Sequence, residues 1–284
     1  MAGISCGVPF NRPLLSSITL AAGMALVSLV QPSEGNVRRA GSASRGLALV
    51  QHFNDSLPRN AGNALRCTSC HLDDGRRGNA MPWSGVSARY PRYRARRGGI
   101  ETIEQRVNEC IARSLSGRML SDSSDAMRDI VAYLDALRDE PAPVRPDTVL
   151  LVGDVRRGAV SWSRRCARCH ATDSGEAVAP PVFGARSYSI GAGMSRQSVL
   201  ATFVRWNMPY DQPGTLSAQE AADVAAYVLR RPRPDHPGKA RDWPGGGAPR
   251  DVAYATDAAR RLGLSLPLVR PVLPRRVSPI PPTS

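Results

Sequence analysis

The sequence predicts an all-α protein that contains one helical unit twice. Two C-x-x-C-H pentapeptides, Cys67–His71 and Cys166–His170, stand far apart in the chain. At nearly the same offset after each pentapeptide comes a residue with a sulfur side chain, Cys110 in the first half and Met208 in the second. A helix-forming stretch that carries a tyrosine closes each half: residues 126–137 (AMRDIVAYLDAL) and 218–229 (AQEAADVAAYVL).

The pentapeptides have the spacing of c-type haem attachment sites. The two thiols of such a motif form thioethers with one porphyrin, and the next imidazole lies under the iron as its proximal ligand. A zinc or thioredoxin-type interpretation would leave both histidines without a role. We therefore predict two tandem class I cytochrome c domains with two covalently bound haem c groups, attached at Cys67, Cys70, Cys166 and Cys169 and ligated by His71 and His170.

Apolar patterning and helix-end signals place the other helices. In the first half, residues 44–53 precede the haem motif, and a capping box at Thr102–Gln105 begins a helix that carries Cys110 and ends at Gly117. In the second half, a helix over residues 153–162 leads into the motif. Prolines interrupt the chain between the halves: Pro141, Pro143 and Pro146.

Residues 1–35 have the pattern of an export signal. Arg12 precedes an apolar run at 13–30, and the segment ends in the short stretch 33–35 (SEG), which suits cleavage. An uncleaved membrane anchor is the alternative. Haem c is attached outside the cytoplasm in bacteria, so we expect a periplasmic protein.

The predicted domains follow from these boundaries. Residues 36–145 form an N-terminal cytochrome c domain around haem 1, and residues 146–235 form a C-terminal domain around haem 2. Residues 236–284 are basic and rich in proline and glycine, which is typical of a wrapping or flexible tail or a docking surface.

The charge of the protein comes almost entirely from arginine. Its 284 residues carry a formal net charge of +14, and Lys239 is the single lysine. Arginine offers a planar, permanently charged fork that suits oxyanions. Such a charge is also common in nucleic-acid-binding proteins, but no nucleic-acid-binding motif accompanies it here, so we expect no nucleic-acid partner.

The sixth ligand of haem 2 has several candidates. Met208 is favoured because it lies in an Asn-Met-Pro turn, where proline stiffens the loop that presents the thioether. Methionine paired with histidine raises the reduction potential of a cytochrome c haem. The rivals remain open: Met194, which follows a Gly-Ala-Gly sequence, together with His52, His236 and Lys239.

Cys110 is the predicted sixth ligand of haem 1. Four of the five cysteines beyond the signal segment are taken by haem attachment, so Cys110 has no disulfide partner. A buried inert thiol is the ordinary alternative, but nearby arginines would stabilise a thiolate, and its offset matches that of Met208. The rival ligands are His52, Met81, Met119 and Met127.

Arginines gather in the sequence before Cys110. Steps of four residues place Arg106, Cys110 and Ser114 on one helix face. Arg96 is the best candidate from the preceding run for a substrate-binding role, with Arg94 as the alternative; the rest of the run fits a solvated surface. The run comprises Arg89, Arg92, Arg94, Arg96 and Arg97.

The sequence resembles the dihaem thiosulfate dehydrogenases over about residues 40–255. The haem-thiolate subunit of the Sox complex is a more distant relative by the same cysteine feature. The stretches that carry the resemblance are CTSCHLDDG (67–75), MPW (81–83), RYPRYR (89–94), IEQRVNECIARSLSG (103–117), GAGM (191–194), NMP (207–209) and RPRPDHPGKARDWP (231–244).

The resemblance implies a periplasmic enzyme that joins two thiosulfates into tetrathionate, or runs the reverse reaction. Cys110, Arg96, Arg106 and Ser114 would form the catalytic site at haem 1. Haem 2 would pass electrons to a soluble or membrane cytochrome c or a similar acceptor. Some family members have a lysine where this chain has Asn207, so a lysine-to-methionine ligand switch is not available here. The alternative is a non-catalytic dihaem electron-transfer cytochrome c.

Overall fold

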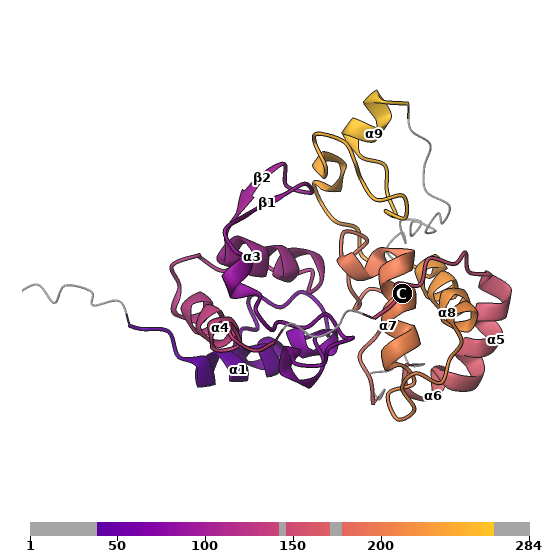
Figure 1. Cartoon of the computed structure of the whole chain (residues 1–284), viewed down its shortest axis with the longest axis horizontal. Coiled ribbons are helices and arrows are strands. Elements are labelled where there is room, and N and C mark those ends of the chain that lie inside the picture. Colours follow the sequence, from indigo (N-terminus) through magenta and orange to yellow (C-terminus); the bar gives the residue numbers. More distant parts are fainter. Residues whose placement is uncertain (1–38, 142–145, 171–177, 264–284) are drawn as a thin grey trace, which may run out of the picture. The chain divides into compact units, whose positions relative to one another are not determined.

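A computed structural model of the chain describes residues 39–141, 146–170 and 178–263 (Figure 1). The expected export signal lies outside these ranges, as does the end of the C-terminal extension. The described residues are mainly helical, as predicted, with one two-stranded antiparallel sheet. None of the helices in these ranges is long and apolar enough to cross a membrane.

The first helical unit comes before the proline-rich linker. Its closing helix α4 (Asp125–Ala136) follows Ser124, whose side chain caps the first turn, and matches the predicted stretch 126–137 within one residue at each end. The elements of this unit are α1 (Ala43–Gln51), α2 (Phe53–Ser56), the 3-10 turns η1 (Cys67–Ser69), η2 (Asp73–Gly75) and η3 (Ser87–Arg89), strands β1 (Arg92–Arg94) and β2 (Gly99–Glu101), α3 (Ile103–Arg113) and α4 (Asp125–Ala136).

The second helical unit repeats this plan and is followed by a short C-terminal part. Asp154 caps its first helix, and Ser217 caps its last helix through a capping box with Glu220. The elements are α5 (Val155–Arg165), α6 (Ala167–His170), the 3-10 turn η4 (Gly193–Ser195), α7 (Gln197–Asn207), α8 (Ala218–Arg230), the 3-10 turn η5 (Lys239–Arg241) and α9 (Asp257–Arg261).

A close helix crossing occurs at the same place in both units. In the first, α1 packs on α4 with Gly46 against the backbone of Asp129, where an added Cβ would lie 2.0 Å from the carbonyl oxygen. In the second, α5 packs on α8 with Gly158 against Asp223, where the same distance would be 1.9 Å. Only glycine allows this approach of two helix backbones.

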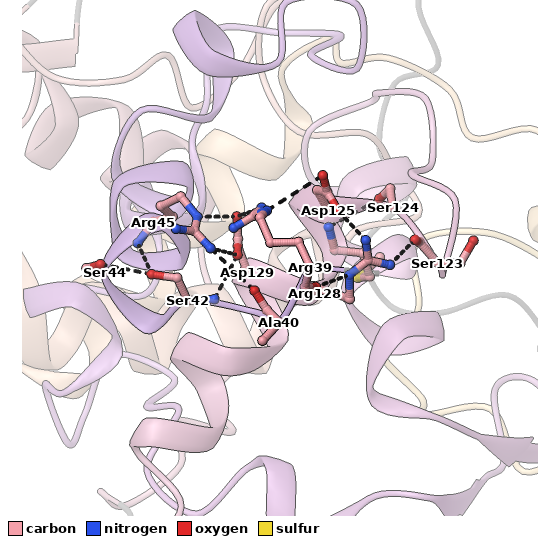
Figure 2. A network of polar contacts seen from close by, with 11 residues as sticks. Arg39, Ala40, Ser42, Ser44, Arg45, Ser123, Ser124, Asp125, Arg128 and Asp129 are labelled. Carbon is pink, nitrogen blue, oxygen red and sulfur yellow. Dashed lines mark hydrogen bonds and ion pairs between the residues drawn. The ribbon is translucent and has the colours of Figure 1, made fainter. Parts of the chain in front are cut away.

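The aspartates at these crossings are buried and fully paired. Asp129 accepts hydrogen bonds from the Ser42 backbone at 2.8 Å and from Arg39 at 2.7 Å, and Arg45 adds a third at 3.1 Å (Figure 2). Asp223 likewise accepts from the Asp154 backbone at 2.7 Å and from an arginine of α5 at 2.6 Å. The repeat therefore extends from the helices to the buried carboxylate at each crossing.

The described part of the C-terminal extension is packed rather than loose. Three of its buried residues, Trp243, Val252 and Tyr254, form a small second core together with Ile190 of the second helical unit. The turn of the β1–β2 hairpin lies against this region, because an added Cβ on Gly98 would fall 2.4 Å from the Pro244 ring. Two buried aromatic side chains, Trp243 and Tyr254, hold this part of the extension in place.

Candidate haem and substrate site

The first haem motif is arranged for iron ligation through one nitrogen of His71. The Nδ1 atom of His71 lies 2.5 Å from the backbone carbonyl oxygen of Met81, and its ring stacks on Trp83 at 4.6 Å. A carbonyl can only accept, so Nδ1 carries the proton and Nε2 stays free for a metal. Burial lowers the pKa of His71 to about 4, which keeps the imidazole neutral near pH 7.

The second haem motif repeats this arrangement. The Nδ1 atom of His170 lies 2.8 Å from the carbonyl oxygen of Pro180, again ten residues further along the chain. Burial lowers the pKa of His170 as well, and Trp162 lies 5.9 Å from its ring. Both motifs thus have the thiols and the oriented, neutral imidazole that a covalently bound haem c needs.

Cys110 lies close to the first haem motif. Its helix α3 begins at the predicted capping box, with Thr102 accepting from the Gln105 backbone, and ends at Arg113, before the predicted Gly117. In the chain without its cofactor, the pKa of the Cys67 and Cys70 thiols is raised to about 12. Burial is the main cause, and the charge of Cys110 is the second. This coupling shows that Cys110 lies near both thiols of the first haem motif.

Arg106 and Ser114 lie one turn before and one turn after Cys110. The negative charge of Cys110 is the main cause that raises the pKa of Arg106 above its ordinary value. Arg106 also helps to lower the pKa of His71, so it lies near both expected iron ligands. Ser114 caps the end of α3, where its backbone N–H donates to the Cys110 carbonyl at 2.8 Å.

A chain of alternating charges runs from Arg106 to the C-terminal extension. Arg106 pairs with Glu109 at 3.1 Å, and Glu109 also pairs with Arg113 at 3.5 Å. Arg113 forms two hydrogen bonds with Asp242, at 2.9 and 2.7 Å, and Asp242 lies 3.9 Å from Arg96. With three guanidinium groups and two carboxylates, this ion network keeps one positive charge.

The sequence pointed to Arg96 and Arg106 as candidates. It did not point to the three residues that connect them, which are Glu109, Arg113 and Asp242. Glu109 and Arg113 stand three and seven residues after Arg106, a spacing that puts all three on neighbouring turns of one helix face, so the pattern was available in the sequence. Asp242 had no such signal, because it comes from a segment 129 residues beyond Arg113.

Of the arginine run, Arg96 is the member that joins the ion network. Its guanidinium lies over the Trp243 ring at 4.5 Å and donates to the Gly191 carbonyl at 3.1 Å. The alternative, Arg94, pairs instead with the fully buried Glu101 at 3.4 Å. The other members of the run, Arg89, Arg92 and Arg97, are exposed.

The predicted ligand Met208 caps the end of α7 and packs partly buried against the main core. Its rival Met194 is buried in η4. Among the rivals for haem 1, the Met119 side chain is exposed to solvent and Met127 is fully buried in the core beneath α4. His236 packs against Gly191 beside the ion network.

Comparison with known proteins identifies the family. Residues 58–139 match the SoxA/TsdA cytochrome c domain, and residues 153–228 match cytochrome c oxidase, cbb3-type, subunit III. A thiosulfate dehydrogenase of Psychrobacter arcticus is 36% identical over 265 residues, which cover 85% of this chain and 81% of that protein. The chain belongs to the thiosulfate dehydrogenase family.

Two further relatives agree with this assignment. A thiosulfate dehydrogenase of Allochromatium vinosum is 36% identical over 213 residues, or 68% of this chain and 78% of that protein. The solved structure of thiosulfate dehydrogenase (TsdBA) from Marichromatium purpuratum in its "as isolated" form matches with a TM-score of 0.65 and 30% identity. That match covers 75% of this chain and 51% of the solved chain, so this chain spans about half the length of that protein.

As a thiosulfate dehydrogenase family member with two cytochrome c domains, the protein carries two covalently bound haem c groups. The motif residues described above fit this cofactor on their geometry as well, because each proximal histidine is oriented by a backbone carbonyl. The sixth ligands, Cys110 and Met208, remain predictions, as do the domain limits 36–145, 146–235 and 236–284.

The choice between the two methionines can be tested by substitution. We expect Met208→Gly to remove the weak sulfur-to-iron absorption in the far red and to lower one of the two reduction potentials, because the thioether favours the reduced iron. Spectra and a redox titration of the dihaem protein measure both effects. Met194→Gly is the matched control, and the assignment is wrong if this control loses the band instead.

Proposed function

We propose that the protein oxidises two thiosulfates to tetrathionate in the periplasm, at a site formed by Cys110, Arg106, Arg96 and Ser114. Each thiosulfate gives up one electron, and one sulfur–sulfur bond forms between them. When bound, the haem groups supply the electron-accepting capacity, one electron each. The observation that carries the proposal is the position of Arg106 one helical turn before the Cys110 thiol, on a helix beside a haem attachment motif.

Electrostatics explains why the site needs arginines. Two unit charges about 4 Å apart repel by roughly 4 kcal/mol at an effective dielectric constant near 20, and thiosulfate is a dianion. Arg106 and Arg96 are both largely shielded from water, with side chains 33% and 14% exposed. Their charges are therefore less screened than those of surface arginines, and together they offset the repulsion between two substrates.

The four residues have separate roles in this proposal. The Cys110 thiolate would hold the iron of haem 1, and Arg106 stabilises the negative charge on that sulfur. Arg96 binds sulfonate oxygens of the substrate, and the Ser114 hydroxyl donates a hydrogen bond to the same group. His170 and Met208 would hold the iron of haem 2, which would supply the outlet for electrons to a cytochrome c or a similar acceptor.

The direct test uses the purified dihaem chain with thiosulfate and an artificial electron acceptor. We expect thiosulfate-dependent reduction of the acceptor and one tetrathionate for every two electrons transferred, with tetrathionate measured by ion chromatography. Turnover of tetrathionate with a reduced donor dye would report the reverse direction. A protein that accepts and releases electrons but forms no tetrathionate would be an electron carrier, and the proposal would be wrong.

A further inference from the structure

The segment after the second helical unit reaches back to the β1–β2 hairpin of the first. The Trp243 backbone N–H donates to the Arg96 carbonyl at 2.9 Å, and the Trp243 ring lies under the Arg96 guanidinium. Both family matches end before this segment, at residues 139 and 228. A part of the chain outside the two cytochrome c domains therefore holds a candidate substrate-binding arginine from two sides.

Asp242 anchors this segment to helix α3. Its carboxylate accepts both hydrogen bonds from Arg113 and a further one from the Tyr254 hydroxyl. Asp242 and Trp243 are both buried. A buried carboxylate with a bidentate guanidinium partner has one preferred geometry, so the neighbouring indole ring is fixed relative to α3 and to Cys110.

Arg96 keeps hydrogen-bonding capacity in this arrangement. A guanidinium has five N–H donors. In the described part of the chain, the Arg96 side chain donates one hydrogen bond, to Gly191, and its nearest carboxylate oxygen is 3.9 Å away. The ring of Trp243 covers one face of the group and occupies none of its N–H donors, which lie in the plane of the guanidinium.

We propose that Asp242 and Trp243 act as a clamp that positions Arg96 for substrate binding, so that the C-terminal extension is part of the substrate site. This inference rests on the proposed function, because it assigns the clamp to thiosulfate binding. Stacking on the indole limits the rotamers of a long side chain before the substrate arrives. Less conformational freedom is then lost on binding, which favours a lower KM.

The main test is Trp243→Leu in the purified dihaem protein. We expect the KM for thiosulfate to rise about fivefold while kcat changes less than about twofold, because Arg96 remains but is no longer held. Trp243→Phe keeps a ring under the guanidinium and should restore most of the parent KM. Asp235→Asn, which alters an exposed ion pair with Lys239 in the same segment, should leave KM unchanged.

A double-mutant cycle separates positioning from general damage. If Trp243 acts through Arg96, Trp243→Leu should add little to the KM of Arg96→Gln. Additive effects in the cycle, or an unchanged KM in Trp243→Leu, would overturn the clamp while leaving the proposed function intact. A parent protein without thiosulfate turnover would overturn both.

Tyr254→Phe gives the same test with a smaller change. It removes the hydroxyl that donates to Asp242 and retains the ring in the second core. We expect the KM for thiosulfate to rise about twofold, which is a smaller rise than in Trp243→Leu, and the haem spectra to resemble those of the parent. If Trp243→Leu does not yield folded dihaem protein, an unchanged KM in Tyr254→Phe contradicts the clamp.

Discussion

Replacement of Cys110 by alanine should abolish tetrathionate formation, with a loss of about a hundredfold or more in turnover. Both haems should remain attached, since their thioethers use the four motif cysteines. The variant should also lose the low-spin thiolate signal in electron paramagnetic resonance. Haem content by pyridine haemochrome, the resonance spectrum and product formation are the three measurements.

Arg106→Gln is the matched control for the role of the thiolate. It removes the charge beside Cys110 and the ion pair with Glu109, but it leaves the Cys110 thiol in place. We expect the thiolate signal to persist while kcat/KM for thiosulfate falls tenfold or more. A Cys110→Ala variant that turns over thiosulfate like the parent would contradict the thiolate-centred site.

Gly158→Ala should disrupt the second helical unit. An added Cβ would lie 1.9 Å from the Asp223 carbonyl oxygen, which belongs to the backbone of α8 and cannot rotate away. Helices α5 and α8 must then move apart, and we expect a loss of about 3 kcal/mol or more in the free energy of unfolding. Thermal unfolding followed at the haem absorption should show a midpoint lower by about 10 °C or more.

Gly193→Ala provides the comparison for this prediction. Gly193 lies in the same unit, and an added Cβ there would meet no atom within 4 Å. Its unfolding midpoint should stay near that of the parent. Equal stability of Gly158→Ala and the parent would show that the two helices do not cross as closely as described.

The repeated parts of the fold were predictable because their signals are local. Both haem motifs, the capping box at Thr102 and the closing helices rest on residues a few positions apart, and the structure has those helices within a few residues of the predicted limits. The paired glycines at 46 and 158 could also have been read from the sequence, since each follows an arginine at the same place in the repeat.

The hairpin and the clamp could not be predicted in the same way. Strands β1 and β2 are each three residues long; β1 lies within the arginine run and β2 follows it, and neither is long enough to show apolar alternation. Asp242 reaches Arg113 across 129 residues, and nothing near Asp242 indicates a buried ion pair. The sequence therefore identified Arg96 as a candidate but could not show which carboxylate and which ring surround it.

The most direct measurement of the central claim is a single turnover without any added acceptor. Oxidised dihaem protein is mixed with excess thiosulfate under anaerobic conditions, and reduced haem and tetrathionate are counted in the same sample. We expect haem reduction with one tetrathionate formed for every two haems reduced, because each haem takes one electron. Haem that stays oxidised, or reduced haem without tetrathionate, would contradict thiosulfate oxidation at this site.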